Sequence, residues 1–166
     1  MLLPLPGSAG RVNYRYEMLE SSVRIAPAAA CSAFGEPAGS ELWQCSRLRT
    51  HRGRPHSVTH NAQRPELGLR HRADDLRRRP MAALLAAQGV QPRYMRRRFH
   101  AATAPPFVAR RLDLTMVDPV LVATFTMHDP DRVCIEWVRI YVHPDHSAPD
   151  ETMDLETGAW TTTEWL

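Results

Sequence analysis

The long apolar side chains of this 166-residue chain lie in two stretches, and this distribution is the strongest constraint on its fold. The stretches cover residues 81–99 and 112–142, whereas the first seventy residues are mostly small, polar or proline. Because burial of apolar surface drives folding, we expect order where those side chains are. The pattern predicts an ordered second half and a poorly ordered, Pro/Gly/Ala/Arg-rich region over residues 1–71.

Charge is strongly segregated along the chain. All 21 basic residues are Arg. Residues 47–111 hold sixteen Arg and three acidic residues, whereas residues 112–166 hold two Arg and eleven acidic residues. A basic block is the electrostatic footprint of a nucleic-acid-binding surface, because neutralised phosphates release their counterions. Two alternatives stay open: a solvated basic face, and a protein-interaction module whose basic block is masked by its acidic tail.

Composition also bears on the origin of the chain and on its compartment. Arg without Lys, with many Ala and Pro, is typical of a GC-rich genome. The same composition arises when a GC-rich gene is read in another frame, so the sequence leaves open whether residues 1–70 fold. Three Cys are too few for a disulfide framework, and no segment approaches the ~20 apolar residues that cross a bilayer. These features predict a cytoplasmic protein without membrane contact.

Helix signals begin near residue 72. Asp74 and Asp75 suit the start of a short helical turn, where carboxylates face the positive end of a helix dipole. Pro80 then favours the first position of a helix, residues 81–88 form its Ala- and Leu-rich body, and Gly89 ends it.

A second helix is predicted from Pro92 to about Ala102. Four basic residues fall on one face of this helix at i, i+3, i+4 and i+7, namely Arg93, Arg96, Arg97 and His100. Met95 and Phe99 lie on the opposite face, where they can pack on the first helix. Two helices joined by a turn of about three residues have helix-turn-helix geometry, in which the second helix enters the major groove of DNA.

The remaining sequence predicts a hairpin and a tail. Residues 120–127 and 133–142 are β-rich runs, and His128–Asp131 between them has the Pro and Asp of a type I turn. This β-hairpin module over residues 113–146 is expected to support the helices or to mediate a homodimer. Residues 147–166 form an acidic tail whose isolated large residues are typical of segments that fold onto partners; a solvated tail is the alternative.

The stretch from Asp74 to Leu112 resembles the first helix-turn-helix of the AraC/XylS family of transcription regulators. The residues that carry the resemblance are Ala86 and Gly89 at the turn, Arg97 and Phe99 in the second helix, Phe107-Val108, and the closing pair Arg111-Leu112. Gln91 stands where that family usually has a Ser that caps the recognition helix, and nothing after Leu112 resembles the family's second motif.

The resemblance implies sequence-specific binding in the major groove of duplex DNA. The contacts that we expect are Gln91, Arg93, Arg96, Arg97 and His100. The predicted fold class is α+β: a helix-turn-helix unit at residues 72–112, then the β-hairpin, with a poorly ordered N-terminal region and an acidic C-terminal tail. The predicted function is that of a DNA-binding transcription regulator that is not an enzyme and uses no cofactor.

Two possible metal sites and one enzyme resemblance are alternatives to this interpretation. The first group is Cys45, His51, His56 and His60, and the second is His128, Asp129, His143 and His146. Neither spacing demands a metal, so no metal site is predicted. The stretch from Val138 to His146 resembles the acetyl-CoA-binding strand of GNAT acetyltransferases, but the acidic loop 147–151 has no Gly to hold pyrophosphate. A degenerate acetyltransferase-like remnant is therefore the enzymatic alternative.

Overall fold

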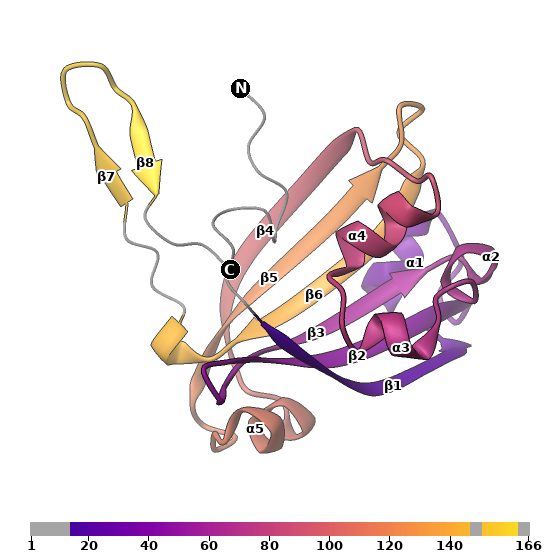
Figure 1. The fold of residues 1–166 in the computed structure, drawn as a ribbon, viewed down its shortest axis with the longest axis horizontal. Helices are drawn as coiled ribbons and strands as arrows, with labels where there is room; N and C mark the ends of the chain where they lie inside the picture. Colours follow the sequence, from indigo (N-terminus) through magenta and orange to yellow (C-terminus); the bar gives the residue numbers. More distant parts are fainter. Residues whose placement is uncertain (1–13, 147–150, 163–166) are drawn as a thin grey trace.

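The computed structural model describes residues 14–146 and 151–162, and its main feature is a six-stranded antiparallel sheet (Figure 1). The strands of this sheet are β1 (Arg15–Ile25), β2 (Glu41–His51), β3 (Arg54–Gln63), β4 (Tyr94–Thr103), β5 (Pro119–His128) and β6 (Cys134–Val142). The helices are α1 (Ala28–Phe34), α2 (Pro65–Gly68), α3 (Ala73–Leu76), α4 (Met81–Ala87), α5 (Pro106–Leu112) and the 3-10 helix η1 (Pro144–His146). Strands β7 (Glu151–Met153) and β8 (Trp160–Thr162) form a separate two-stranded sheet.

The strand order across the large sheet is β1-β2-β3-β6-β5-β4. Strands β2 and β3 form a hairpin that turns at Arg52 and Gly53. The φ angles of these two residues, 50° and 78°, are both positive, as in the type I′ turns that match the twist of paired strands. Strand β3 then pairs with β6 from Ser57↔Val142 to Ala62↔Trp137. This pairing joins the first three strands to the last three, so both halves of the chain build one sheet.

The fold of residues 15–63 contradicts the prediction that the N-terminal region is poorly ordered. Residues 15–63 form three strands of the sheet instead of a poorly ordered region. The reason is that many of their buried side chains are polar, which hides the alternation that marks a strand. In β2, Gln44, Ser46 and Arg47 are all buried. Burial of such groups is tolerated where they are hydrogen-bonded.

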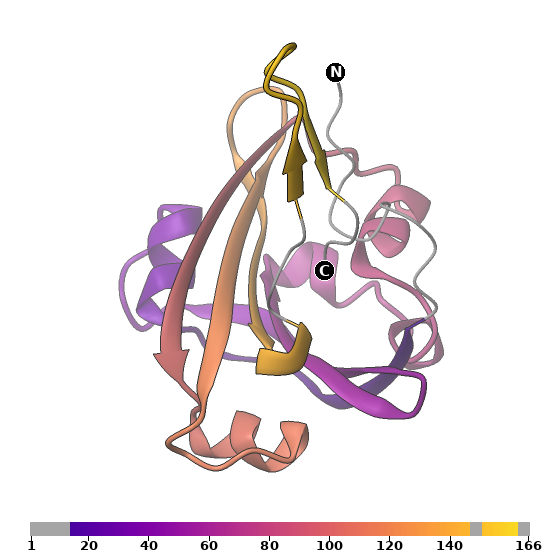
Figure 2. The same ribbon diagram turned by 90° about the vertical axis from the view of Figure 1, so that its left-hand side faces the viewer.

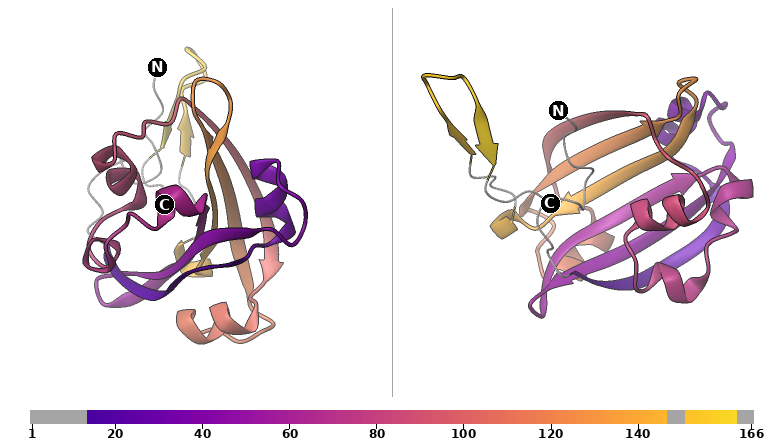
Figure 3. Two further views of the ribbon diagram at one scale, coloured as in Figure 1. Left: turned by 90° about the vertical axis from the view of Figure 1, so that its right-hand side faces the viewer. Right: turned by 45° about the horizontal axis from the view of Figure 1, so that its top comes forward.

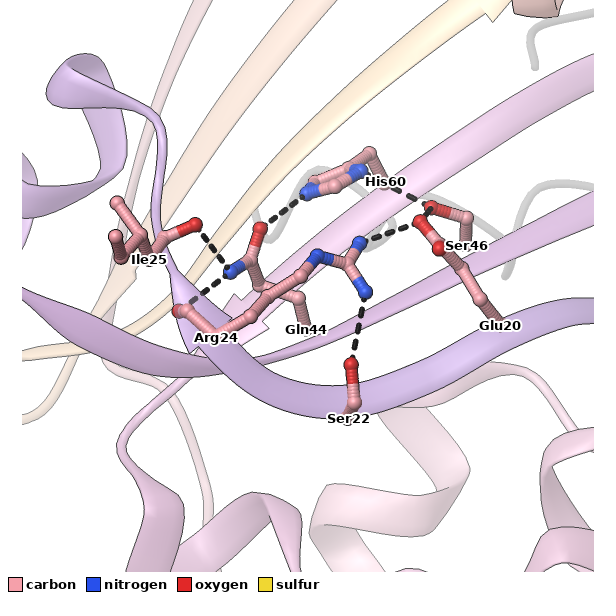
Figure 4. Close-up of polar contacts among 7 residues, drawn as sticks. All are labelled: Glu20, Ser22, Arg24, Ile25, Gln44, Ser46 and His60. Atoms are coloured by element: carbon pink, nitrogen blue, oxygen red, sulfur yellow. Dashed lines mark hydrogen bonds and ion pairs between the residues drawn. The ribbon is translucent and has the colours of Figure 1, made fainter.

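Figure 4 shows one such network, built on strands β1, β2 and β3. The Gln44 amide donates to the main-chain carbonyls of Arg24 and Ile25 at 2.9 and 3.1 Å, and its Oε1 lies 3.0 Å from His60 Nε2. The other ring nitrogen of His60 lies 3.0 Å from Ser46 Oγ. Burial lowers the pKa of His60 to about 4, so the ring is neutral and each nitrogen has one partner. Polar side chains thus fill part of the core.

Helices cover both faces of the sheet, as Figures 2 and 3 show. On one face α1 and α5 pack at opposite ends: Phe34 of α1 lies in a cluster with Leu42 and Trp137, and Leu112 of α5 lies in a cluster with Val58. The opposite face carries residues 65–90, which include α2, α3 and α4 and are called the cover below. The core under the cover consists of Leu76, Met81, Leu84 and Leu85 against Trp43 and Cys45.

The predicted recognition helix at residues 92–102 is wrong, because Tyr94–Thr103 is strand β4, at the edge of the sheet. The strand pairs with β5 along its whole length, from Tyr94↔His128 to Thr103↔Pro119. The apolar residues Met95 and Phe99 are four positions apart, a spacing that places them on one face of a helix and also on one face of a strand. Pairing with β5 decides between the two, and the helix-turn-helix fold class is therefore overturned.

The first predicted helix and the two β-rich runs are found in the structure as one helix and two strands. Helix α4 lies at the predicted place and Gly89 follows it with a φ of 75°. Residues 119–128 and 134–142 are antiparallel strands, yet they lie inside the six-stranded sheet and do not form a separate hairpin module. Within residues 14–146 and 151–162, no helix is long and apolar enough to span a membrane.

Candidate functional site

A cavity of about 190 Å³ lies between the sheet and the cover. Its polar lining residues are Tyr14, Tyr16, Arg47, Arg49, Asn61, Arg78 and Glu136. Its apolar lining residues include Pro80 and Met81 from the cover and Phe125, Met127, Val138 and Ile140 from the sheet. The volume is below the ~300–1,000 Å³ of pockets for drug-sized ligands, so the cavity suits a small molecule.

Strand alternation brings the polar residues of the cavity together. Arg47 and Arg49 are two positions apart in β2, so both side chains project from the same face of the sheet. Asn61 of β3 lies directly opposite Cys45 of β2 and Val138 of β6 in the ladder. Glu136 precedes Val138 by two residues and shares its face. Three neighbouring strands therefore present two guanidinium groups, an amide and a carboxyl group to one space.

Arg47 joins the sheet to the cover. Its Nη1 donates to the main-chain carbonyls of Leu76 and Arg79 at 3.2 and 2.7 Å. Leu76 is the last residue of α3, where the carbonyls of a helix have no partner within the helix, and Arg79 lies in the loop between α3 and α4. The guanidinium also lies over the Tyr16 ring, 4.8 Å from its centroid. Burial lowers the pKa of Arg47, but an arginine remains a cation at neutral pH.

Arg49 lies nearer the N-terminal end of β1, opposite Tyr16, and is half-buried. Its guanidinium carbon is 5.5 Å from the Tyr14 ring centroid, and burial lowers its pKa as well. The Nε atoms of Arg47 and Arg49 are both buried without a hydrogen-bond partner. Among the described carboxylates, none forms an ion pair with either arginine. Two cations thus lie at a cavity where no described carboxylate pairs with them, an arrangement that costs free energy unless a ligand supplies the negative charge.

Glu136 is the acidic residue of the cavity and is completely buried. Its Oε1 accepts hydrogen bonds from Asn61 Nδ2 at 2.7 Å and from Gln63 Nε2 at 3.3 Å, whereas Oε2 has no partner. Burial raises the pKa of Glu136 to about 7, although the two donors and the nearby Arg47 act to lower it. At neutral pH the carboxyl group can therefore bind a ligand either as an acceptor or, when protonated, as a donor.

The residues that the sequence analysis proposed as DNA contacts lie elsewhere. Arg93, Arg96, Arg97 and His100 are exposed on or next to the edge strand β4, and Gln91 is exposed in the loop before it. Strands β3, β6 and β5 separate β4 from β2, the strand that carries Arg47 and Arg49. The structure places these five residues along one edge and not on a helix face. Whether they contact DNA stays a prediction.

The structure groups the histidines of the two possible metal sites differently from the groups that the sequence suggested. His56 stacks on His146 with ring centroids 4.7 Å apart, and His143 lies 5.8 Å from His146. In the described part of the chain, however, no three His, Cys, Asp or Glu side chains are arranged to hold a metal ion. Cys45 is buried, and burial raises the pKa of its thiol to about 11, which disfavours the thiolate that metals bind.

The model of the UTRA domain matches residues 9–147. This chain belongs to the UTRA domain family. The match includes residues 74–112, so the AraC/XylS resemblance is overturned: Ala86 and Gly89 lie at the end of α4 in the cover of a UTRA domain, and Arg97 and Phe99 lie on its edge strand. The match also includes β6, which carried the acetyltransferase resemblance. No curated protein matches the chain.

Solved structures share the fold of this UTRA domain. The ligand-binding domain of a candidate GntR-family transcriptional regulator from Bordetella bronchiseptica is 17% identical, with a TM-score of 0.74 over 98% of this chain and 94% of that chain. PhnF from Mycobacterium smegmatis is 18% identical, with a TM-score of 0.72 over 86% of this chain and 63% of that chain. The possible transcriptional regulator YydK from Bacillus subtilis is 13% identical, with a TM-score of 0.73 over 82% of this chain.

This UTRA domain spans only 60% of the YydK chain. The regulator class of the sequence prediction agrees with these comparisons, whereas its arginine-rich recognition helix does not. The sequence analysis missed Arg47, Arg49, Asn61 and Glu136. A signal for the first two was present, because Arg47 and Arg49 alternate with Leu48 in a run that also contains Leu42 and Trp43. Charged residues on the buried face of a strand are typical of a binding site.

Proposed function

We propose that this UTRA domain is the sensory part of a transcription regulator, and that the cavity under the cover binds a small anionic effector. Two solved structures with this fold support the proposal: the ligand-binding domain from Bordetella bronchiseptica and the effector domain of PhnF. In this proposal the domain reports effector binding to a linked DNA-binding region. It carries out no chemical reaction.

The observation that carries the proposal is the pair of arginines at the cavity. Arg47 and Arg49 have buried Nε atoms without partners and no carboxylate within ion-pair distance in the described chain. Guanidinium groups suit carboxylate and phosphate oxygens, which accept two parallel hydrogen bonds. The effector therefore carries a carboxylate or a phosphate group at this end of the cavity.

Glu136 defines the other half of the effector. Its Oε2 faces no protein donor, so a ligand hydroxyl or ammonium group is the natural partner. Tyr14, Tyr16, Met81 and Phe125 add aromatic and apolar surface to the lining of the cavity. The chemistry of the site thus describes a small molecule that is anionic at one end and bears a hydrogen-bond donor at the other.

Isothermal titration calorimetry with matched probes tests this proposal. A sugar phosphate, a hydroxy acid and a zwitterionic amino acid are compared with inorganic phosphate and with a neutral sugar. We expect binding only by a probe that carries both an anion and a donor, and at least tenfold weaker binding by the Arg49→Gln variant. Arg70→Gln, an exposed arginine of the cover, is the control. Equal affinity of both variants would contradict the site.

We propose as a second function that the residues predicted from the sequence to contact DNA do so from a strand and not from a helix. Arg93, Arg96, Arg97 and His100 lie exposed along the edge strand β4, where they can reach phosphates without a recognition helix. Binding of the full chain to duplex DNA is then non-specific and falls steeply with salt. A quadruple alanine variant should lose that binding. Absence of DNA binding by the unmodified chain at low salt would rule this proposal out.

A further inference from the structure

A line of side-chain hydrogen bonds runs from the cover to the cavity. Gln88, which ends α4, has its Nε2 2.8 Å from His71 Nδ1. The other ring nitrogen, Nε2, lies 2.8 Å from Gln63 Oε1. Gln63 Nε2 in turn donates to Glu136 Oε1 at 3.3 Å. Four side chains from the cover, β3 and β6 thus form one continuous path.

The chemistry of these groups gives the path one direction. When Glu136 is ionised it can only accept, so Gln63 Nε2 faces Glu136 Oε1 and the carbonyl oxygen of Gln63 faces His71. That carbonyl requires a donor, which is the Nε2–H of a neutral imidazole. The Nδ1 atom of the same ring then accepts from the Gln88 amide. Burial, followed by the charge of Arg47, lowers the pKa of His71, which keeps the ring neutral.

Close packing holds His71 at this place. The residue follows α2, where an added Cβ on Gly68 would lie 2.2 Å from Trp43 Cγ, so the helix lies directly against the indole ring. The His71 ring contacts the same indole with centroids 5.2 Å apart. Gln63 and Trp43 are both buried. The backbone around His71 therefore has little freedom to move away from Gln63.

We infer that His71 is a positioning residue of the cavity: it orients the Gln63 amide toward Glu136 Oε1, leaves Oε2 for the ligand, and fastens the cover through Gln88. The ligand part of this inference rests on the proposed function. The orienting part concerns the free protein alone. Its consequence is that the position of the cover and the hydrogen bonding of Glu136 are linked through one imidazole ring.

The charged and titratable groups around the path are few. Arg47 acts on both Glu136 and His71, and Asp75 of the cover acts on His71. The thiols of Cys45 and Cys134 interact with Glu136, and both have a pKa of about 11, so they stay neutral. A change in the Glu136 pKa caused by a His71 variant can therefore be traced through Gln63 and Arg47.

The test is a titration of the Glu136 carboxyl group in the full chain without ligand, followed by carbon-13 NMR of labelled glutamate. The Glu136→Gln spectrum identifies the signal. In His71→Leu we expect the pKa of Glu136 to rise by about half a unit, because the freed Gln63 amide no longer holds its NH₂ on Oε1. His71→Gln, whose amide nitrogen can reach the place of Nε2, should stay close to the unmodified protein.

The opposite sign separates positioning from packing. If His71 only fills space, its loss lets water into the cavity and the pKa of Glu136 falls toward 4.5; that result, or no change, overturns the inference. Nitrogen-15 spectra of the unmodified protein give a second test that needs no variant. We expect His71 to be protonated at Nε2 alone, and a ring protonated at Nδ1 overturns the inference. Neither measurement depends on an effector, so a failed ligand screen would leave both results standing.

Discussion

Arg47 of strand β2 donates a 2.7 Å hydrogen bond to the main-chain carbonyl of Arg79, and this bond ties the sheet to the cover above the cavity. A second bond to the Leu76 carbonyl reinforces it. The guanidinium of the neighbouring cation, Arg49, lies over the face of the Tyr14 ring, and its Nε has no hydrogen-bond partner. The two arginines of the cavity thus have different roles: both line the space for the ligand, but Arg47 also holds the cover on the sheet.

This difference predicts unequal effects on stability. Arg47→Gln should lower the free energy of unfolding by about 2 kcal/mol, because the carbonyls of Leu76 and Arg79 lose a charged donor. Arg49→Gln should lower it by less than about 1 kcal/mol, the usual value of a cation–π contact. Urea unfolding of both variants measures the difference, with Arg70→Gln as the exposed control. Equal losses would show that Arg47 does not hold the cover.

Glu136 should make stability depend on pH in the direction opposite to most carboxyl groups. Its folded pKa of about 7 lies above the ordinary value of 4.5, so the folded state binds the proton more tightly. The group's contribution is therefore lost as pH rises from 4.5 through 7, by about 3 kcal/mol at most. In Glu136→Gln this loss disappears, and the variant should gain stability relative to the unmodified chain over that window. Urea unfolding at several pH values measures the gain; a difference that is constant with pH would contradict the raised pKa.

His56 should contribute in acid. Burial, then the nearby His146 and Arg49, lower its pKa to about 3, whereas an unfolded histidine titrates near 6.5. The unfolded chain therefore takes up a proton that the folded chain does not, and stability falls as pH falls from 6.5 toward 3. His56→Asn should unfold in acid with a shallower pH dependence, followed by circular dichroism. The exposed His100→Asn should not change that dependence, and identical slopes for both variants would exclude His56 as the cause.

Gly68 should not tolerate a side chain. An added Cβ would lie 2.2 to 2.5 Å from three atoms of the Trp43 side chain, so the indole or α2 must shift. Gly68→Ala is expected to cost about 2 kcal/mol or more, the range of overpacked cores. It should also weaken effector binding, because α2 leads into His71. Leu69→Ala, at a residue that is 66% exposed, is the control for thermal unfolding. A Gly68→Ala melting temperature equal to that of the control would show that the cover is loosely packed.

Part of the fold was readable from local signals. Pro80, the Ala- and Leu-rich run and Gly89 predicted a helix where α4 lies. The two β-rich runs predicted strands where β5 and β6 lie, since residues of this type favour extended backbone whatever their partners. The candidate site could not be read in this way. Arg47 in β2, Asn61 in β3 and Glu136 in β6 are far apart in sequence, and only the β2–β3–β6 pairing brings them together.

By itself the sequence determined the segments that have a local signal, which is either a regular spacing of apolar side chains or a residue that ends a helix. Such signals act within a single helical turn or strand. Only the tertiary structure decided the conformation of residues 94–103. The four-residue spacing of Met95 and Phe99 fits both a helix and a strand, and pairing with β5 selects the strand. The tertiary structure likewise decided residues 15–63, where polar side chains are buried among their own hydrogen-bond partners. The arginine excess is a property of the sequence; the burial of Arg47 and the exposure of Arg96 are consequences of strand order, because position in the sheet sets which charges lose water.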